Sequence, residues 1–180
     1  MTAPQLRSAM RASRLVRFNR SVEAGWVNGY VLDVGPELFL LALVSDQIRF
    51  DGFQALRLRD VRELRENPFA SFVEAALKAR HERRPRKPKV NLGSLRSLLL
   101  SAGRAFPLVS IHRERVDAGT CQIGRVMGVS KGKARILEIG PGAVWDKKPT
   151  DYALKQITRV DFGGAYEDAL HLVGGDPPTG

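Results

Sequence analysis

Along the chain a helical period of apolar residues is followed by the alternation typical of strands, and this order occurs twice. In residues 3–14, small or apolar side chains recur every three to four positions, which is typical of an amphipathic helix. The apolar alternation and short apolar runs that follow predict strands over residues 15–22, 26–34, 38–44, 53–58 and 61–64. The pair Asp51-Gly52 predicts a hairpin turn between two of these strands. The helical period then returns, with an expected apolar side made of Phe69, Phe72, Val73, Ala76 and Leu77.

The second half of the chain has the same order of patterns. Asn91 is placed to cap a helix, whose apolar side would carry Leu92, Leu95, Leu98, Leu99 and Ala102. Extended structure is expected over residues 107–116, and strands over residues 122–129, 134–139 and 152–160. A lysine-rich turn at residues 130–133 joins two of these strands, and a short helix over residues 165–172 closes the half.

Direct similarity between the halves indicates an internal duplication. Residues 15–34 align with residues 108–129 and share nine identical positions, which include the pairs Gly25/Gly119 and Gly29/Gly124. The match extends to two aromatic positions, Phe50 and Trp145. An aromatic ring kept at matched places in a diverged duplication suggests a shared packing need. We therefore expect Phe50 and Trp145 to be structural residues.

Several short strands per copy, with glycine where the sheet must bend, favour a small closed or half-closed barrel. Each copy has a Gly-x-Val strand, Gly29-Tyr30-Val31 or Gly124-Arg125-Val126, and a final element that reads Leu-Arg-Asp-Val or Leu-Lys-Gln-Ile. With these motifs the chain resembles the Sm-like and SH3-like small barrels, and most of all a family of uncharacterised bacterial proteins that carry this barrel in tandem. PRC-type barrels of ribosome-maturation factors have a similar strand rhythm. The RNA-binding loop motifs of true Sm proteins are not recognisable, so the resemblance implies the barrel and not the Sm mode of RNA binding.

The predicted fold class is mainly β with flanking helices (α+β), built as two tandem Sm-like/SH3-like small barrels. The first module, with its N- and C-terminal helices, is expected over residues 1–79, and a basic, proline-containing linker over residues 80–90. The second module is expected over residues 91–173, followed by a disordered tail over residues 174–180. Modules this small bury only part of their surface alone, so the two copies are expected to pack on each other.

The positive charge is concentrated outside the repeated cores. Residues 1–20 contain five arginines and no acid, and residues 78–89 contain seven cations and one glutamate. These two segments together exceed the net charge of +10, so the rest of the chain is close to neutral. Such clusters are the usual electrostatic footprint of nucleic-acid binding, with a solvated, solubilising charge run as the equally weighted alternative. The candidate nucleic-acid-binding residues are Arg7, Arg11, Arg14, Arg17, Arg80, Arg83, Arg84, Arg86, Lys87 and Lys89.

No pattern in the sequence indicates catalysis or metal binding. The three histidines lie far apart, at His81, His112 and His171. His112 is expected to point outward from a strand, as a surface or packing residue. Cys121 is the only cysteine and aligns with Trp26, so a packing position is favoured over a reactive thiol. Asp51 and Asp146 occupy matched places and are favoured as turn residues over an acid–base pair. The prediction is no catalytic residue, no metal and no cofactor.

The sequence therefore predicts a non-catalytic binding protein. The leading hypothesis is an RNA-associated adaptor that contacts RNA or another polyanion through its basic N-terminal helix and linker. The alternative is a protein-interaction or self-assembly module, in which another protein or a second copy binds by strand addition or helix docking. No membrane partner is expected, because the N-terminal helix has a weak apolar face. A single cysteine and the lack of an apolar leader favour a cytoplasmic setting.

Overall fold

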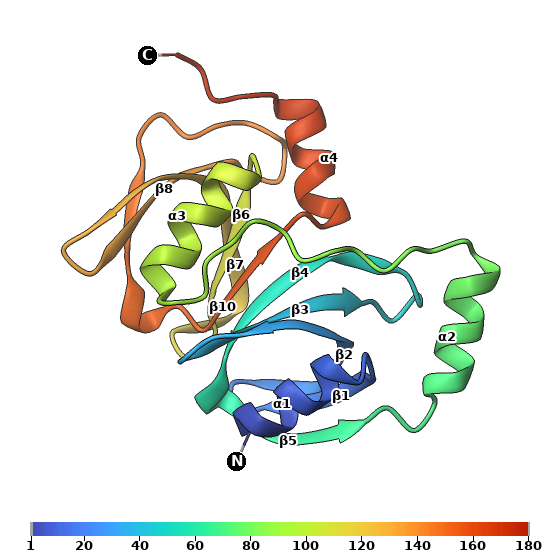
Figure 1. Ribbon diagram of the computed structural model, residues 1–180. Helices are drawn as coiled ribbons and strands as arrows, with labels where there is room; N and C mark the ends of the chain where they lie inside the picture. Colours follow the sequence, from blue (N-terminus) through green and yellow to red (C-terminus); the bar gives the residue numbers. More distant parts are fainter. Residues whose placement is uncertain (1, 180) are drawn as a thin grey trace.

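The order of elements in the first half is repeated in the second half (Figure 1). The computed structural model describes residues 2–179. The first half consists of α1 (Thr2–Arg11), β1 (Leu15–Arg20), β2 (Glu23–Val34), β3 (Leu38–Val44), β4 (Phe50–Arg57), the 3₁₀ turn η1 (Leu58–Asp60), β5 (Val61–Glu66) and α2 (Ala70–Ala79). The second half consists of α3 (Leu95–Ala105), β6 (Val109–Arg113), β7 (Asp117–Ser130), β8 (Lys133–Glu138), β9 (Thr150–Ala153), η2 (Leu154–Gln156), β10 (Arg159–Phe162) and α4 (Ala165–Gly174).

All ten strands form one antiparallel sheet in the order β5-β1-β2-β3-β4-β10-β6-β7-β8-β9. Within each half the order is the same, because β10 lies beside β6 as β5 lies beside β1. The sheet is open, and the two tandem small barrels expected from the sequence, closed or half-closed, are not shown. The edge of β4 pairs with β10 rather than with β5, in a register that sets Ala55 opposite Val160. The mainly β prediction with flanking helices is confirmed.

Two equivalent glycines allow the close approach of neighbouring strands. A Cβ atom on Gly29 would lie 2.4 Å from the carbonyl oxygen of Ala42, and one on Gly124 would lie 2.1 Å from that of Leu137. Both distances are too short for any side chain. The neighbouring strand, β3 or β8, can therefore approach this position only when the residue is glycine. This steric need accounts for the repeated Gly-x-Val motif.

An apolar core cluster crosses the boundary between the halves. Leu40 and Ala55 of the first half are buried in the same cluster as Leu98 and Leu99 of α3 and Val160 of β10. A second cluster lies under α1, which buries Leu6 and Ala9 against the strands. The sequence predicted that the two copies pack on each other, because each half is too small to bury a full core alone. The shared cluster confirms this.

Buried polar contacts also cross this joint. Arg20 of β1 has a fully buried side chain and pairs with Glu114 after β6 and with Glu23. Arg159 of β10 donates to Glu23 across 2.8 Å, and Arg57 of β4 donates to the carbonyl oxygen of Ile157 across 2.7 Å. Except for Glu23 with Arg20, these partners come from opposite halves, so separating the halves would leave buried charges with fewer partners.

Two local predictions are wrong. The β3–β4 hairpin turns at residues 45–49, and Asp51-Gly52 lies inside β4. There the Asp51 carboxylate accepts from the backbone N–H of Ala165 across 2.8 Å at the start of α4, and Gly52 takes a φ of +70° against the Gly163–Gly164 backbone. Asn91 does not cap α3 either. Ser94 is the N-cap, because its hydroxyl accepts from the N–H of Ser97 across 3.0 Å.

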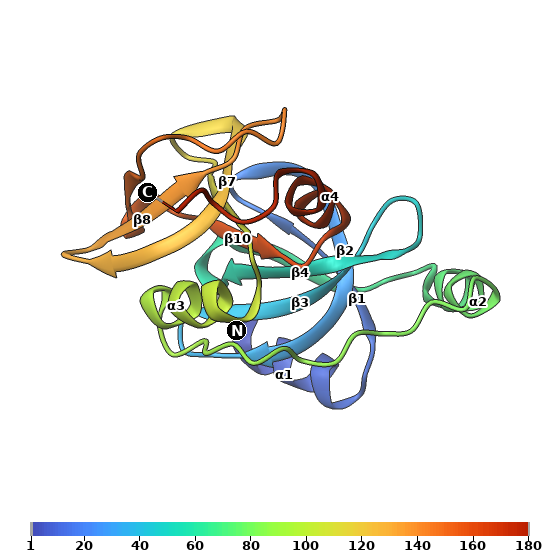
Figure 2. The same cartoon turned by 90° about the horizontal axis from the view of Figure 1, so that it is seen from above.

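The connection from α2 to α3 runs along the outside of the first half without regular secondary structure between residues 82 and 88. It follows the second part of β2, where Lys87 pairs with Asp33 and Leu92 lies against Gly35. Figure 2 shows this segment running from α2 to α3. Its end packs on the sheet face of Leu38 and Leu40, whereas α1 packs on the opposite face, against Phe39 and Leu41. The predicted tail begins with the last residue of α4, Gly174, and ends at Gly180, which lies outside the described residues. Within residues 2–179, no helix has the length and apolar character needed to cross a membrane.

Candidate nucleic-acid interface

The N-terminal helix presents its arginines to solvent because its opposite side is fixed to the core. Leu6 and Ala9 are buried, so Arg7 and Arg11 are turned outward, and Arg14, which follows the helix, is also exposed. Arg14 pairs with Glu66 across 3.5 Å, at side-chain exposures of 45% and 59%. Such a pair contributes little and yields readily to a competing anion.

The linker presents a second group of cations. Arg80 is held in place, because its guanidinium donates to the carbonyl oxygens of Gln47 and Ile48 in the β3–β4 turn. Arg84 stacks on the ring of Tyr30 at 4.4 Å, and burial together with Glu74 raises the pKa of that tyrosine to about 12. Lys87 pairs with Asp33. Within residues 2–179 the exposed linker cations that have no acidic partner are Arg80, Arg83, Arg84, Arg86 and Lys89.

The end of the first basic segment approaches the linker, although about 70 residues separate the two segments in the sequence. Ser13, which follows α1, and Arg84 of the linker line the same surface hollow beside Tyr30. The helix α1 itself packs on the opposite face of the sheet from the end of the linker segment. We call α1 together with residues 80–89 the basic surface. The sequence predicts each segment, and the fold brings the end of the first close to the second.

Arg17 belongs to a separate place on the outer face of β1. It lies directly opposite Arg65 of β5 on one side and Asn28 of β2 on the other. Both guanidinium groups lie over the ring of Trp26, at 4.2 Å for Arg17 and 5.4 Å for Arg65. Like charges at directly opposite positions repel each other, so this pair of arginines is arranged to attract an anion.

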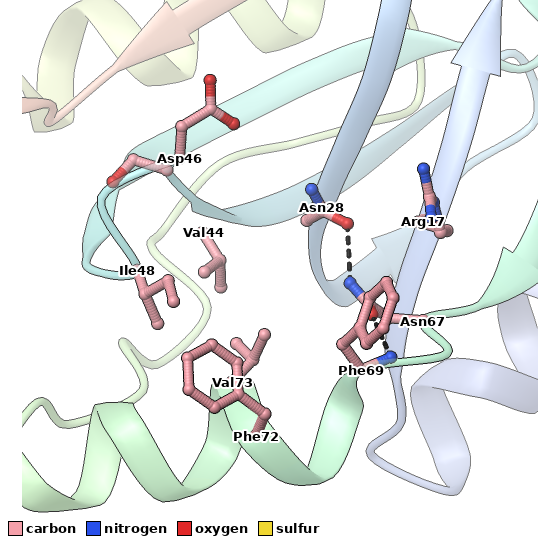
Figure 3. Close-up of a pocket in the computed structure, with 10 residues that line it drawn as sticks. Arg17, Asn28, Val44, Asp46, Ile48, Asn67, Phe69, Phe72 and Val73 are labelled. Atoms are coloured by element: carbon pink, nitrogen blue, oxygen red, sulfur yellow. Dashed lines mark hydrogen bonds between the residues drawn. The ribbon is translucent and has the colours of Figure 1, made fainter.

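A hollow of about 430 Å³ begins at Arg17 and continues to the start of α2 (Figure 3). One wall is apolar, and the other carries the amides of Asn28 and Asn67. Asn67 donates to the side-chain oxygen of Asn28 across 2.8 Å, and its own side-chain oxygen accepts from the N–H of Phe69 across 2.8 Å. The residues that line the hollow are Arg17, Asn28, Val44, Ser45, Asp46, Ile48, Asn67, Phe69, Phe72 and Val73.

The sequence analysis placed two lining residues wrongly. Phe69 and Phe72 were expected on the apolar side of α2, but their exposed fractions are 66% and 64%. Val73 and Leu77 are the buried residues of this helix. Asn28, Asn67, Trp26 and Arg65 were not predicted as site residues. The repeat itself carries a clue to one of them, because Asn28 aligns with Ile123 in the second copy.

The other candidate residues lie away from this surface. His112 is not turned to solvent, since its Nε2 lies 3.0 Å from the carboxylate of Asp161 at a side-chain exposure of 13%. Cys121 is exposed at the residue level rather than packed, although partial burial of its sulfur raises the pKa of the thiol. Trp145 donates to the carbonyl oxygens of Gly174 and Gly175, both at 3.3 Å. In the part of the chain that the structure describes, no group of three or more His, Cys, Asp or Glu residues is arranged to hold a metal ion.

The comparisons with known proteins give no further assignment. No protein-family model matches the chain, and no significant match is found among the curated proteins or the solved structures.

Proposed function

We propose that the protein is a non-catalytic nucleic-acid-binding protein, an RNA-associated adaptor that contacts the phosphate backbone with its basic surface. One observation carries the proposal. Two arginine-rich segments from distant parts of the sequence approach each other where Ser13 and Arg84 line one hollow, and most of their cations lack an acidic partner within residues 2–179. Guanidinium groups suit phosphate because they offer planar, paired donors.

The basic surface contains few groups that could read bases. Its contacts would therefore be to phosphates, which position a nucleic acid without selecting its sequence. Binding of this kind releases counterions, so the affinity should fall steeply as the salt concentration rises.

We also propose that each half is a small Sm-like or SH3-like module and that the chain arose by duplication of one such module. The repeated order of helices, strands and 3₁₀ turns supports this origin, as does the repeated strand order within the sheet. The two modules would then be fused at one edge through β4 and β10.

The linker gives the sharpest test of the proposal. Replacing Arg83, Arg86 and Lys89 with glutamine removes three exposed charges that have no acidic partner within residues 2–179. Fluorescence anisotropy with a labelled single-stranded RNA should show weaker binding, and the slope of log K against log salt should fall by up to about 2, at ~0.7 for each lost phosphate contact. The control variant replaces Lys147, Lys148 and Lys155, which are exposed in the second half, and should bind like the original protein.

Either of two results would overturn the proposal. The first is no binding to RNA or DNA at about 50 mM salt, where phosphate contacts are strongest. The second is an equal loss in the linker and control variants, since that would show a dependence on total charge and not on the basic surface.

Self-assembly is a second candidate function, and the sheet edges favour it. The strands β5 and β9 remain at the two edges of the sheet, and they are the equivalents of β10 and β4, which pair at the centre. A second copy could add to these edges in the same way. However, β5 carries Arg62, Glu63, Arg65 and Glu66, and such charges protect an edge strand from pairing. Light scattering coupled to size exclusion should show a mass well above 19.9 kDa if this function holds.

A further inference from the structure

We propose that the hollow beside Arg17 receives one unpaired base of a single-stranded nucleic acid, while Arg17 and Arg65 bind its phosphate. This inference rests on the proposed function and names the form of nucleic acid that it selects. It concerns a place separate from the basic surface. The basic surface would attract any polyanion, whereas this hollow would distinguish an exposed base from a paired one.

The apolar wall has the character of a stacking platform. Phe69 and Phe72 expose about two thirds of their surface, 66% and 64%, at the mouth of the hollow. Figure 3 shows Phe72 reaching towards Val44 and Ile48 from α2, and Phe69 beside Asn67. Two neighbouring aromatic rings that the fold leaves unburied mark an interaction site, and bases stack on such rings whatever their sequence.

The polar wall is prepared for a hydrogen-bonding ligand. Asn67 is fixed at both ends of its amide, by Asn28 and by the N–H of Phe69. This leaves the Nδ2 group of Asn28 without a partner among residues 2–179. An amide donor held in a fixed direction can serve the edge of a base. The carboxylate of Asp46 points away from the other lining side chains in Figure 3, so it does not repel an anion there.

The phosphate would lie next to the base, at the two arginines. The Nε of Arg17 is buried and has no acceptor among the described residues. Its guanidinium is held over Trp26, with Arg65 directly opposite. A phosphate between the two guanidinium groups would relieve their repulsion and supply the missing acceptors. Arg65 also pairs with the exposed Glu63, a contact that a phosphate can displace.

The duplication argues that these residues are not required by the fold. In the second half the position of Arg17 is taken by Ser110, that of Asn28 by Ile123 and that of Arg65 by Asp161. The equivalent strands and the helix that follows them are nevertheless retained. A purely structural requirement would act on both copies. The first copy therefore carries a set of arginines and amides that serves another purpose.

The test compares three probes on the full chain: a single-stranded oligouridine, an abasic oligonucleotide of the same length, and a duplex. The test variant is Phe69→Ala with Phe72→Ala, and the control is Leu172→Ala with Val173→Ala, which are 86% and 77% exposed on α4. The original protein should bind oligouridine more tightly than the other two probes. The test variant should lose at least about fivefold for oligouridine, with its salt slope unchanged, and should bind the abasic and duplex probes as before.

A second readout uses Trp26 as a local reporter in a Trp145→Phe background, which removes the other tryptophan. Saturating oligouridine should change the Trp26 emission, and the abasic probe should change it less. Equal binding of the oligouridine and abasic probes by the original protein would overturn the inference, and so would an unchanged oligouridine affinity in the test variant. The basic surface would then stand alone. No binding of any probe by the original protein would instead remove the proposed function itself.

Discussion

The first and second halves differ most at one equivalent place, where the last helix of each half meets the sheet. In the first half, Asn28 and the exposed rings of Phe69 and Phe72 surround an open hollow. In the second half, Ile123 packs with Leu108, Ile139 and Leu170 in a closed apolar cluster. The same strands thus support a filled core in one copy and an open, polar hollow in the other. The lesson is that the fold needs the helix contact but not the hollow.

The largest expected difference between the two places is the loss of protein stability when a side chain on the last helix of each half is truncated. Leu170→Ala removes a side chain that is 5% exposed, so it should lower the free energy of unfolding by about 2–5 kcal/mol. Phe72→Ala acts on an exposed ring and should change it by no more than about 0.5 kcal/mol. Urea unfolding of the two variants measures both values, and equal losses would break the comparison.

Exchanging the two equivalent residues sharpens the same comparison. Ile123→Asn places an amide in the apolar cluster of the second half and should cost about 1–3 kcal/mol, because the new group finds no partner there. Asn28→Ile removes the acceptor of the Asn67 amide beside an open hollow, where water can replace it. It should therefore lower the thermal midpoint less than Ile123→Asn does, and it should reduce the preference for single-stranded over abasic probes. Two equally destabilised proteins would mean that both positions serve packing.

A smaller effect on stability is expected when Arg65 is replaced with aspartate, the residue at the equivalent position 161 of the second half. Arg65→Asp replaces repulsion with attraction opposite Arg17, as Asp161 lies opposite Ser110 in the second half. Stability should rise by no more than about 1 kcal/mol, since the side chain at position 65 is exposed. RNA binding should weaken at the same time. A variant that binds RNA more tightly would contradict the role given to this arginine pair. The matched control, Arg62→Asp, lies on the same strand and should have the weaker effect on binding.

The smallest expected effect concerns pH and the joint between the halves. Burial alone would raise the pKa of Glu23, but hydrogen bonding and the charges of Arg20 and Arg159 hold it below its usual value of 4.5. A carboxylate with a lowered folded-state pKa stabilises the fold above its unfolded pKa, and this stability is lost as the pH falls through the folded value. Thermal midpoints measured between pH 6 and pH 3 should therefore fall less steeply in Glu23→Gln than in the original protein. Identical slopes would show that this carboxylate does not contribute to acid unfolding.

The sequence predicted local elements better than it predicted their assembly. The periods around Leu38–Val44 and Ala165–Gly174 were sufficient for a strand and a helix, because burial on one face sets each pattern. The pairing of β4 with β10 was not predictable, since it depends on contacts between residues about 100 positions apart. The pair Asp51-Gly52 illustrates this limit of local prediction. In isolation it is a turn motif, but in the fold the Asp51 carboxylate accepts from the backbone N–H at the start of α4.

The candidate site was predictable only in part, and for a similar reason. Runs of arginine and lysine are visible in the sequence because charge needs no partner to be counted. The hollow depends on which side of α2 faces the sheet. The helical period suggested that Phe69 and Phe72 would be buried, but the single turn held by Val73 and Leu77 leaves both rings exposed. Asn28 and Asn67 come from separate segments, and only the folded chain brings their amides together.

Ultraviolet crosslinking of single-stranded oligouridine to the full chain, followed by mass spectrometry of the peptides, tests the central claim most directly. The account predicts crosslinks in the peptide that contains Phe69 and Phe72 and in the linker peptides of residues 80–89, with few in residues 108–174. Both sets should decline with added salt, and the first set should be lost with an abasic probe. Crosslinks confined to the second half, or none above those of a protein-free control, would contradict the account.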